Sequence, residues 1–119
     1  MTEERRKHPR IKASHPVVFH TNVERKPRLG LTVDLSMGGT QIESVYSLTT
    51  HEELELAIHT DLLIIACKGK VMYVFEPDSG NVKAGIRFEA LSEYDRLYLR
   101  HYLFHIMGQR MLEPSLFLV

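Results

Sequence analysis

The sequence predicts an all-β domain with one helix: a six-stranded antiparallel β-barrel followed by a C-terminal α-helix. Three observations favour this class. About six short segments alternate in polarity or are rich in β-branched and aromatic residues, tight polar turns rather than helical crossovers join them, and apolar residues adopt helical spacing only after residue 91. A chain of 119 residues is large enough for one core but not for two, and antiparallel strands in this number close readily into a small barrel.

Three strands are predicted in the N-terminal half, at 17–23 (VVFHTNV), 29–36 (LGLTVDLS) and 40–45 (TQIESV). The polar turn ERKPR separates the first two, and a Gly-Gly pair separates the second from the third, as in a hairpin. Alternation along the second strand predicts one face toward the core and one toward solvent. The expected inward residues are Leu31, Val33 and Leu35, and the expected outward residues are Thr32, Asp34 and Ser36.

Three more strands are predicted at 53–59 (ELELAIH), 62–76 (LLIIACKGKVMYVFE) and 82–90 (VKAGIRFEA). In the second of these, Gly69 interrupts a long apolar run, which indicates a bend or bulge. The turn signal PDSGN separates the last two strands. The residues of the first strand that should face the core are Leu54, Leu56 and Ile58.

One helix is predicted after the last strand. Ser92 can cap its first turn, Asp95 follows three residues later, and acidic residues are favourable at a helix N-terminus. Gly108 is well placed to end it. The apolar residues that repeat at helical spacing, and so predict the buried face, are Leu99, Tyr102, Leu103, Ile106 and Met107.

Charge and composition limit the classes of function. The formal net charge is zero, but residues 1–28 carry eight Lys/Arg against three Glu, whereas residues 29–119 carry seven Lys/Arg against twelve Asp/Glu. A basic N-terminal segment on an otherwise acidic chain favours an anionic ligand that binds locally, since a nucleic-acid-binding domain is usually basic throughout. No apolar run is long enough to span a bilayer, no signal peptide is recognised, and the single cysteine, Cys67, excludes an internal disulfide. We therefore expect a cytoplasmic protein.

The chain divides into three predicted segments: a basic arm of residues 1–14, the barrel with its helix at 15–110, and an apolar tail at 111–119. Five Lys/Arg lie in the first twelve residues, and Pro9 keeps this part of the chain from forming an ordinary helix. The tail either packs across the barrel or forms a dimer contact, and the sequence leaves both possibilities open.

The hairpin and the arm contain the candidate ligand-binding groups. Asp34 and Ser36 are expected on one outward face, where a carboxylate that accepts and a hydroxyl that donates or accepts suit the N1–H and N2–H₂ edge of guanine. The Gly38–Gly39 pair permits positive φ and close approach of a flat ligand. Arg6 and Arg10 are four residues apart, and arginine matches phosphate oxygens or the O6/N7 edge of guanine. A polar hairpin and a solubilising basic tail are the alternatives.

The order of these motifs resembles the PilZ domain family. RxxxR at Arg6–Arg10 precedes DxSxxG at Asp34–Gly39. The Arg5–Arg6 pair, the Gly38–Gly39 doublet and GIRF at Gly85–Phe88, before a helix with an acidic cap, are also similar to the family. The resemblance covers nearly the whole chain, and no motif position departs from the pattern.

The resemblance implies a six-stranded antiparallel barrel with a C-terminal helix that acts as a non-catalytic receptor for the bacterial second messenger cyclic di-GMP. The implied ligand-binding residues are Arg5, Arg6, Arg10, Asp34, Ser36, Gly38 and Gly39, with His8 as a secondary contact. By similarity, the two arginines of RxxxR bind phosphate and guanine, the hairpin side chains read a guanine edge, and Gly39 leaves room for it. In this family an arginine at the position of Arg5 accompanies an intercalated pair of ligands.

Ligand binding by a flexible arm predicts that residues 1–12 become ordered and signal to a downstream protein partner. A homodimer is compatible with the apolar tail, whereas a cofactor, nucleic acid and a membrane span are not expected. Two alternatives stay open: a nucleic-acid-binding β-barrel, and a PilZ-like adaptor that binds only protein. The sequence contains no nucleophile–base pattern and no phosphate-binding loop, so an enzyme is not expected. The His101–His105 pair has no evident third ligand for a metal.

Overall fold

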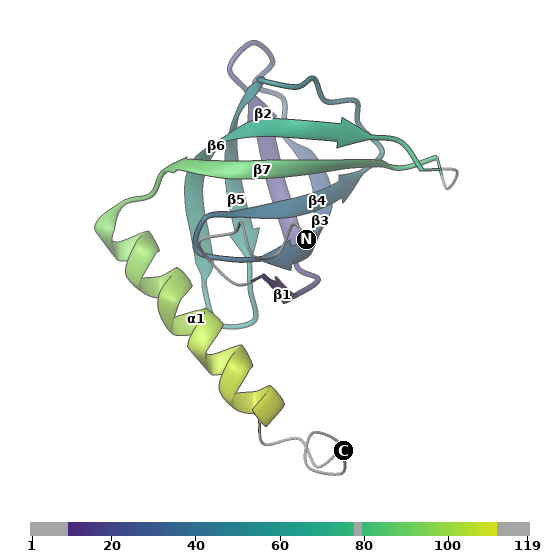
Figure 1. Ribbon diagram of the computed structural model, residues 1–119. Helices are drawn as coiled ribbons and strands as arrows, with labels where there is room; N and C mark the ends of the chain where they lie inside the picture. The colour runs from purple at the N-terminus through teal and green to yellow at the C-terminus, as the bar shows by residue number, and fades with distance from the viewer. Residues whose placement is uncertain (1–9, 78–79, 112–119) are drawn as a thin grey trace.

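The structure is a computed structural model that describes residues 10–77 and 80–111. These residues form seven strands and one helix (Figure 1). The strands are β1 (Ile11–Lys12), β2 (Pro16–Thr21), β3 (Arg28–Leu35), β4 (Gly39–Ser44), β5 (Glu53–His59), β6 (Ile64–Phe75) and β7 (Val82–Ala90), and the helix is α1 (Glu93–Met111).

Strands β2 to β7 close into an antiparallel barrel, which confirms the predicted fold class (Figure 1). The strand order is β1-β3-β2-β5-β6-β7-β4, and pairing of β3 with β4 closes the sheet. The additional strand β1 lies within the expected arm and pairs with the end of β3, with Ile11 opposite Leu35 and Lys12 opposite Asp34. This pairing fixes Arg10, the residue before β1, beside the β3–β4 hairpin.

A bulge in β3 makes part of the predicted alternation wrong. The register with β4 shifts between Thr32 and Asp34, so Val33 is an extra residue on the β3 side. Before the bulge Thr32 is the inward residue, at 1% exposure, while Leu31 is 49% exposed. After the bulge Leu35 is fully buried, as predicted. One extra residue exchanges the two faces of a strand, and nothing in the polarity pattern marks where it occurs.

The core contains aliphatic and aromatic side chains from all six barrel strands. The predicted inward residues of β5 are confirmed as buried: Leu54, Leu56 and Ile58. The predicted irregularity at Gly69 is also confirmed, because the β6–β7 register shifts between Lys68 and Gly69. Cys67 is buried in this core, and burial raises the pKa of its thiol to about 12, with the Asp95 carboxylate as a smaller contribution. It therefore packs as a small apolar residue.

Helix α1 begins where predicted but ends later. The Ser92 hydroxyl accepts the Asp95 N–H at 3.0 Å, and the Asp95 carboxylate accepts the Ala66 N–H of β6 at 3.1 Å, which attaches the helix start to the barrel. The buried helix residues are Leu99, Tyr102, Leu103 and Ile106. Met107 is 42% exposed, so its predicted burial is wrong. Gly108 does not end the helix, because its φ is not in the left-handed region and α1 continues to Met111.

A buried histidine joins the chain before β2 to α1, and the sequence gives no sign of it. His15 is 8% exposed, and its Nε2 shares a hydrogen bond with the hydroxyl of Tyr102. The His15 N–H donates to the Thr32 hydroxyl at 2.9 Å, and the same hydroxyl donates to the Ala13 carbonyl. Burial lowers the pKa of the His15 imidazole, and the Asp61 carboxylate partly opposes this. The fold therefore favours neutral His15.

Candidate functional site

The turn between β3 and β4 is held by the hydroxyl group of Ser36. This oxygen accepts the backbone N–H of Gly38 at 3.1 Å and of Gly39 at 3.2 Å, and it donates to the Gly39 carbonyl at 3.3 Å. Ser36 is 4% exposed, and β3 ends one residue before it. The prediction that Ser36 projects outward beside Asp34 is therefore wrong. Its side chain shapes the turn.

Gly39 provides space for the neighbouring strand rather than a left-handed turn. Neither Gly38 nor Gly39 adopts the positive φ that glycine permits. A Cβ atom on Gly39 would lie 2.1 Å from the carbonyl oxygen of Ile86 in β7. The Phe88 N–H donates to the Gly38 carbonyl at 2.9 Å, so β7 also fixes the turn from outside the hairpin.

Asp34 connects the hairpin to the end of the arm. Its Oδ1 accepts the Gln41 N–H at 3.0 Å, beside the bulge, and its Oδ2 accepts from Arg10 Nη1 at 3.4 Å. The side chains of Arg10 and Asp34 are 24% and 19% exposed. Asp34 is thus partly buried and has a role in the hairpin, whereas the alternation predicts an exposed group. The ion pair joins the end of the arm to the hairpin.

Arg10, the Ser36 turn and strands β6 and β7 line one pocket of about 420 Å³, here called the arm pocket. The predicted residues that it brings together are Arg10, Ser36, Gly38 and Gly39. The lining residues that sequence reasoning missed are Met72, Tyr73, Gly85, Ile86, Arg87 and Phe88. Four of these belong to the GIRF segment, and they reach the pocket because β4 pairs with β7, a non-local pairing that sequence periodicity does not indicate.

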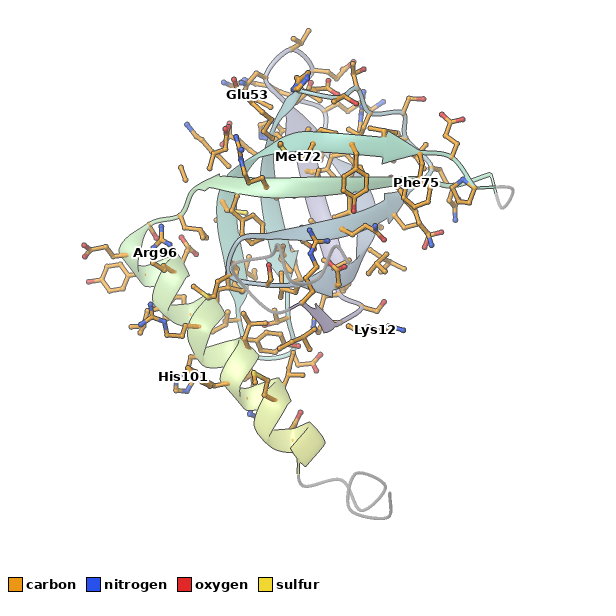
Figure 2. The ribbon with its side chains drawn as sticks, viewed as in Figure 1. Lys12, Glu53, Met72, Phe75, Arg96 and His101 are labelled. Carbon is orange, nitrogen blue, oxygen red and sulfur yellow. The ribbon has the colours of Figure 1, made fainter. Side chains whose placement is uncertain are left out.

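Tyr73 forms an aromatic wall of the arm pocket. Its ring packs over Gly85, where a Cβ atom would lie 2.1 Å from Tyr73 Cε2. The Gln41 side-chain amide donates to the Tyr73 hydroxyl at 2.9 Å, which fixes the ring, and Phe75 stacks on it with 6.2 Å between ring centroids. Met72 and Phe75 lie along β6 (Figure 2). A fixed aromatic surface beside a cation suits a flat anionic ligand.

The electrostatic character of the arm pocket comes from two arginines. Arg10 is paired with Asp34, and Arg87, whose side chain is 54% exposed, lies 3.3 Å from a carboxylate oxygen of Glu89. No acidic side chain is among the described residues that line the pocket. Each arginine therefore has a weak, partly exposed ion pair that a more highly charged anion could replace.

The other predicted arm residues, Arg5, Arg6 and His8, lie outside the described residues. Over 10–77 and 80–111, no group of three His, Cys, Asp or Glu side chains is arranged to hold a metal ion. The one helix of that part of the chain is not apolar enough over its length to cross a membrane.

The family model for the PilZ domain matches residues 4–105, which include every strand and most of α1. The chain belongs to the PilZ domain family. The family indicated by the two sequence motifs is thereby confirmed. A search of curated protein sequences finds no significant match to this PilZ domain.

Solved structures share the fold of this PilZ domain at low sequence identity. The Bacillus subtilis inhibitor of motility (MotI/DgrA) is 21% identical with a TM-score of 0.74, over 87% of this chain and 52% of that one. YcgR from Escherichia coli, in complex with c-di-GMP, is 17% identical with a TM-score of 0.74, over 90% and 48%. The PilZ domain of YcgR with c-di-GMP is 14% identical with a TM-score of 0.73, over 89% and 94%. The chain spans about half the length of the first two proteins.

Proposed function

We propose that this PilZ domain binds cyclic di-GMP in the arm pocket and acts as a non-catalytic receptor. The observation that carries the proposal is that Arg10 and the Ser36–Gly39 turn, which are separated in sequence, line one pocket, with Asp34 paired to Arg10 beside it. Family membership and the two YcgR structures with c-di-GMP support the choice of ligand.

The chemistry of the arm pocket fits a compact dianion with purine faces. Arg10 would exchange its single carboxylate for phosphate oxygens or a guanine edge, since charge-assisted bidentate contacts are the stronger ones. The Asp34 oxygen released from Arg10 would accept a guanine N–H. Ser36 has a different role from the one its motif suggests, because its hydroxyl already bonds to two N–H groups and one carbonyl. It would hold the turn in shape for the ligand.

Strands β6 and β7 would supply the rest of the binding surface. The Tyr73 ring offers a stacking face for a base, and bases stack on aromatic side chains with about 1–3 kcal/mol each. Arg87 offers a second cation at the pocket rim. Arg5, Arg6 and His8 would complete the site from the arm, and ordering of the arm around the ligand would carry the signal to a protein partner.

Isothermal titration of the full chain with cyclic di-GMP tests the proposal. We expect saturable binding at micromolar concentration, and the stoichiometry reports whether one ligand or an intercalated pair is bound. Cyclic di-AMP, which has the same backbone without the guanine edge, is the control and should bind much more weakly. Equal binding of both dinucleotides, or salt-sensitive binding of single-stranded RNA without binding of cyclic di-GMP, would contradict the proposal.

A further inference from the structure

The face of α1 that points away from the barrel is largely apolar. Residues on this outer face follow helical spacing opposite the buried residues Leu99 and Ile106, and several are large and exposed. The exposed side chains are Tyr94 at 73%, Leu97 at 56% and Tyr98 at 41%. Phe104, 67% exposed, lies at the edge of this face, because it also lines a pocket with Ile11 and Met37. Two histidines continue the stripe, and Figure 2 shows His101 pointing away from the barrel. No Lys, Arg, Asp or Glu lies in the middle of this stripe.

A surface of this kind usually contacts another molecule. Exposed apolar residues scattered singly need no explanation, but these lie on successive turns of one helix. Two charged residues of α1, Glu93 and Arg100, lie on the same flank of the stripe because seven residues make almost two full turns. Neither forms a salt bridge with another described residue.

We propose that the outer face of α1 binds the same face of a second copy of this chain, with the two helices antiparallel. Under two-fold symmetry each contact must occur twice, so the face has to be complementary to itself. A two-fold axis at Leu97 meets this requirement. It places the two Leu97 side chains against each other, and it brings Glu93 of each copy within one residue of the level of Arg100 of the other, on the same flank.

The other flank of the stripe is also complementary to itself under this two-fold axis. Tyr94 of one copy comes within one residue of the level of His101 of the other, which pairs a phenol hydroxyl with an imidazole nitrogen across the interface. The three pairings, Leu97 with Leu97, Glu93 with Arg100 and Tyr94 with His101, require the same axis position to within one residue. Antiparallel helices also align their dipoles favourably. The coincidence of apolar, charged and polar pairings on one axis is what selects a second copy over another partner.

The arrangement of the domain leaves room for such a dimer. The barrel lies on the inner side of α1, and the last turns of the helix project beyond it (Figure 1). Two helices joined by their outer faces would therefore have their barrels on opposite sides, and both arm pockets would stay accessible. The proposed dimer forms through α1 alone and requires no ligand.

Sedimentation velocity of the full chain without nucleotide, over a concentration series, tests the proposed dimer. We expect a concentration-dependent dimer, and we expect Leu97→Glu to be monomeric because it places two carboxylates face to face in an apolar contact. Leu62→Glu is the matched control, since Leu62 is 57% exposed, as Leu97 is 56% exposed, but lies in the β5–β6 turn. A monomer at every concentration, or a dimer that both substitutions leave intact, would overturn the proposal.

A charge exchange tests the axis itself. Glu93→Arg and Arg100→Glu should each weaken the dimer at least about tenfold, as like charges then meet across the interface. The double variant should restore the dimer, because the charges are exchanged in both copies. Circular dichroism confirms that the helix remains formed in each variant. Failure of the double variant to recover, with the single variants folded, would rule out the antiparallel pairing centred on Leu97.

Discussion

On the hairpin side of the arm pocket, polar groups are bonded within the fold, whereas on the arm side Arg10 makes one ion pair among residues 10–77 and 80–111, with Asp34. The Ser36 hydroxyl has three backbone partners, and Gly39 is packed against a backbone carbonyl. Arg10 is held at 3.4 Å from a carboxylate and is partly exposed. The two halves of the proposed site therefore have different roles. The hairpin is needed for the fold and for the proposed binding, whereas Arg10 is available mainly for the proposed binding.

The largest effect on stability is expected at Gly39. Gly39→Ala should lower the free energy of unfolding by about 3 kcal/mol, because the new methyl group overlaps the Ile86 carbonyl oxygen and backbone must move. Urea denaturation measures the change. Gly85→Ala is the comparison: its methyl group overlaps the ring of Tyr73, so a side chain has to give up its Gln41 hydrogen bond and move, but no backbone has to shift. A loss of about 1 kcal/mol is expected there. Equal losses would show that the hairpin is less constrained than proposed.

A smaller loss is expected when the turn hydroxyl is removed. Ser36→Ala leaves the N–H groups of Gly38 and Gly39 without their acceptor in a buried turn, which should cost about 1–2 kcal/mol. Ser47, an exposed residue of the β4–β5 loop, provides the control, and Ser47→Ala should change the free energy of unfolding very little. If the two variants unfold at the same urea concentration, the turn does not depend on Ser36.

These positions also show how far the sequence predicts the molecule. The barrel, the inward residues of β5 and the start of α1 follow from local periodicity and capping, which are properties of neighbouring residues. The bulge at Val33 and the burial of Ser36 depend on the register between β3 and β4, and the contribution of Tyr73 and Arg87 depends on the pairing of distant strands. Sequence motifs therefore indicate Arg10 and Asp34, which the structure pairs, as members of the proposed site, but they assign Ser36 the wrong orientation.

A still smaller effect is expected from pH at His15. Burial lowers the pKa of His15 in the folded chain. The stability that neutral His15 contributes is therefore complete above the pKa of His15 in the unfolded chain, about 6.5. It is lost as the pH falls through the lower pKa of the folded chain. The unfolded chain binds the proton first, which favours unfolding in acid. Melting temperatures of the native chain and His15→Gln, measured from neutral to mildly acidic pH, should converge as pH falls. A constant difference between them would show that His15 does not titrate in this way.

The central claim is that Arg10 is needed mainly for ligand binding, whereas the hairpin is also needed for the fold. Isothermal titration of Arg10→Ala with cyclic di-GMP, beside urea denaturation of the same variant, tests it most directly. We expect affinity to fall at least about tenfold, while the free energy of unfolding changes by no more than about 0.5–1 kcal/mol because the ion pair is partly exposed. Arg25→Ala, which removes an exposed arginine from the β2–β3 turn, should bind normally. An Arg10→Ala variant that binds like the native chain would contradict the claim.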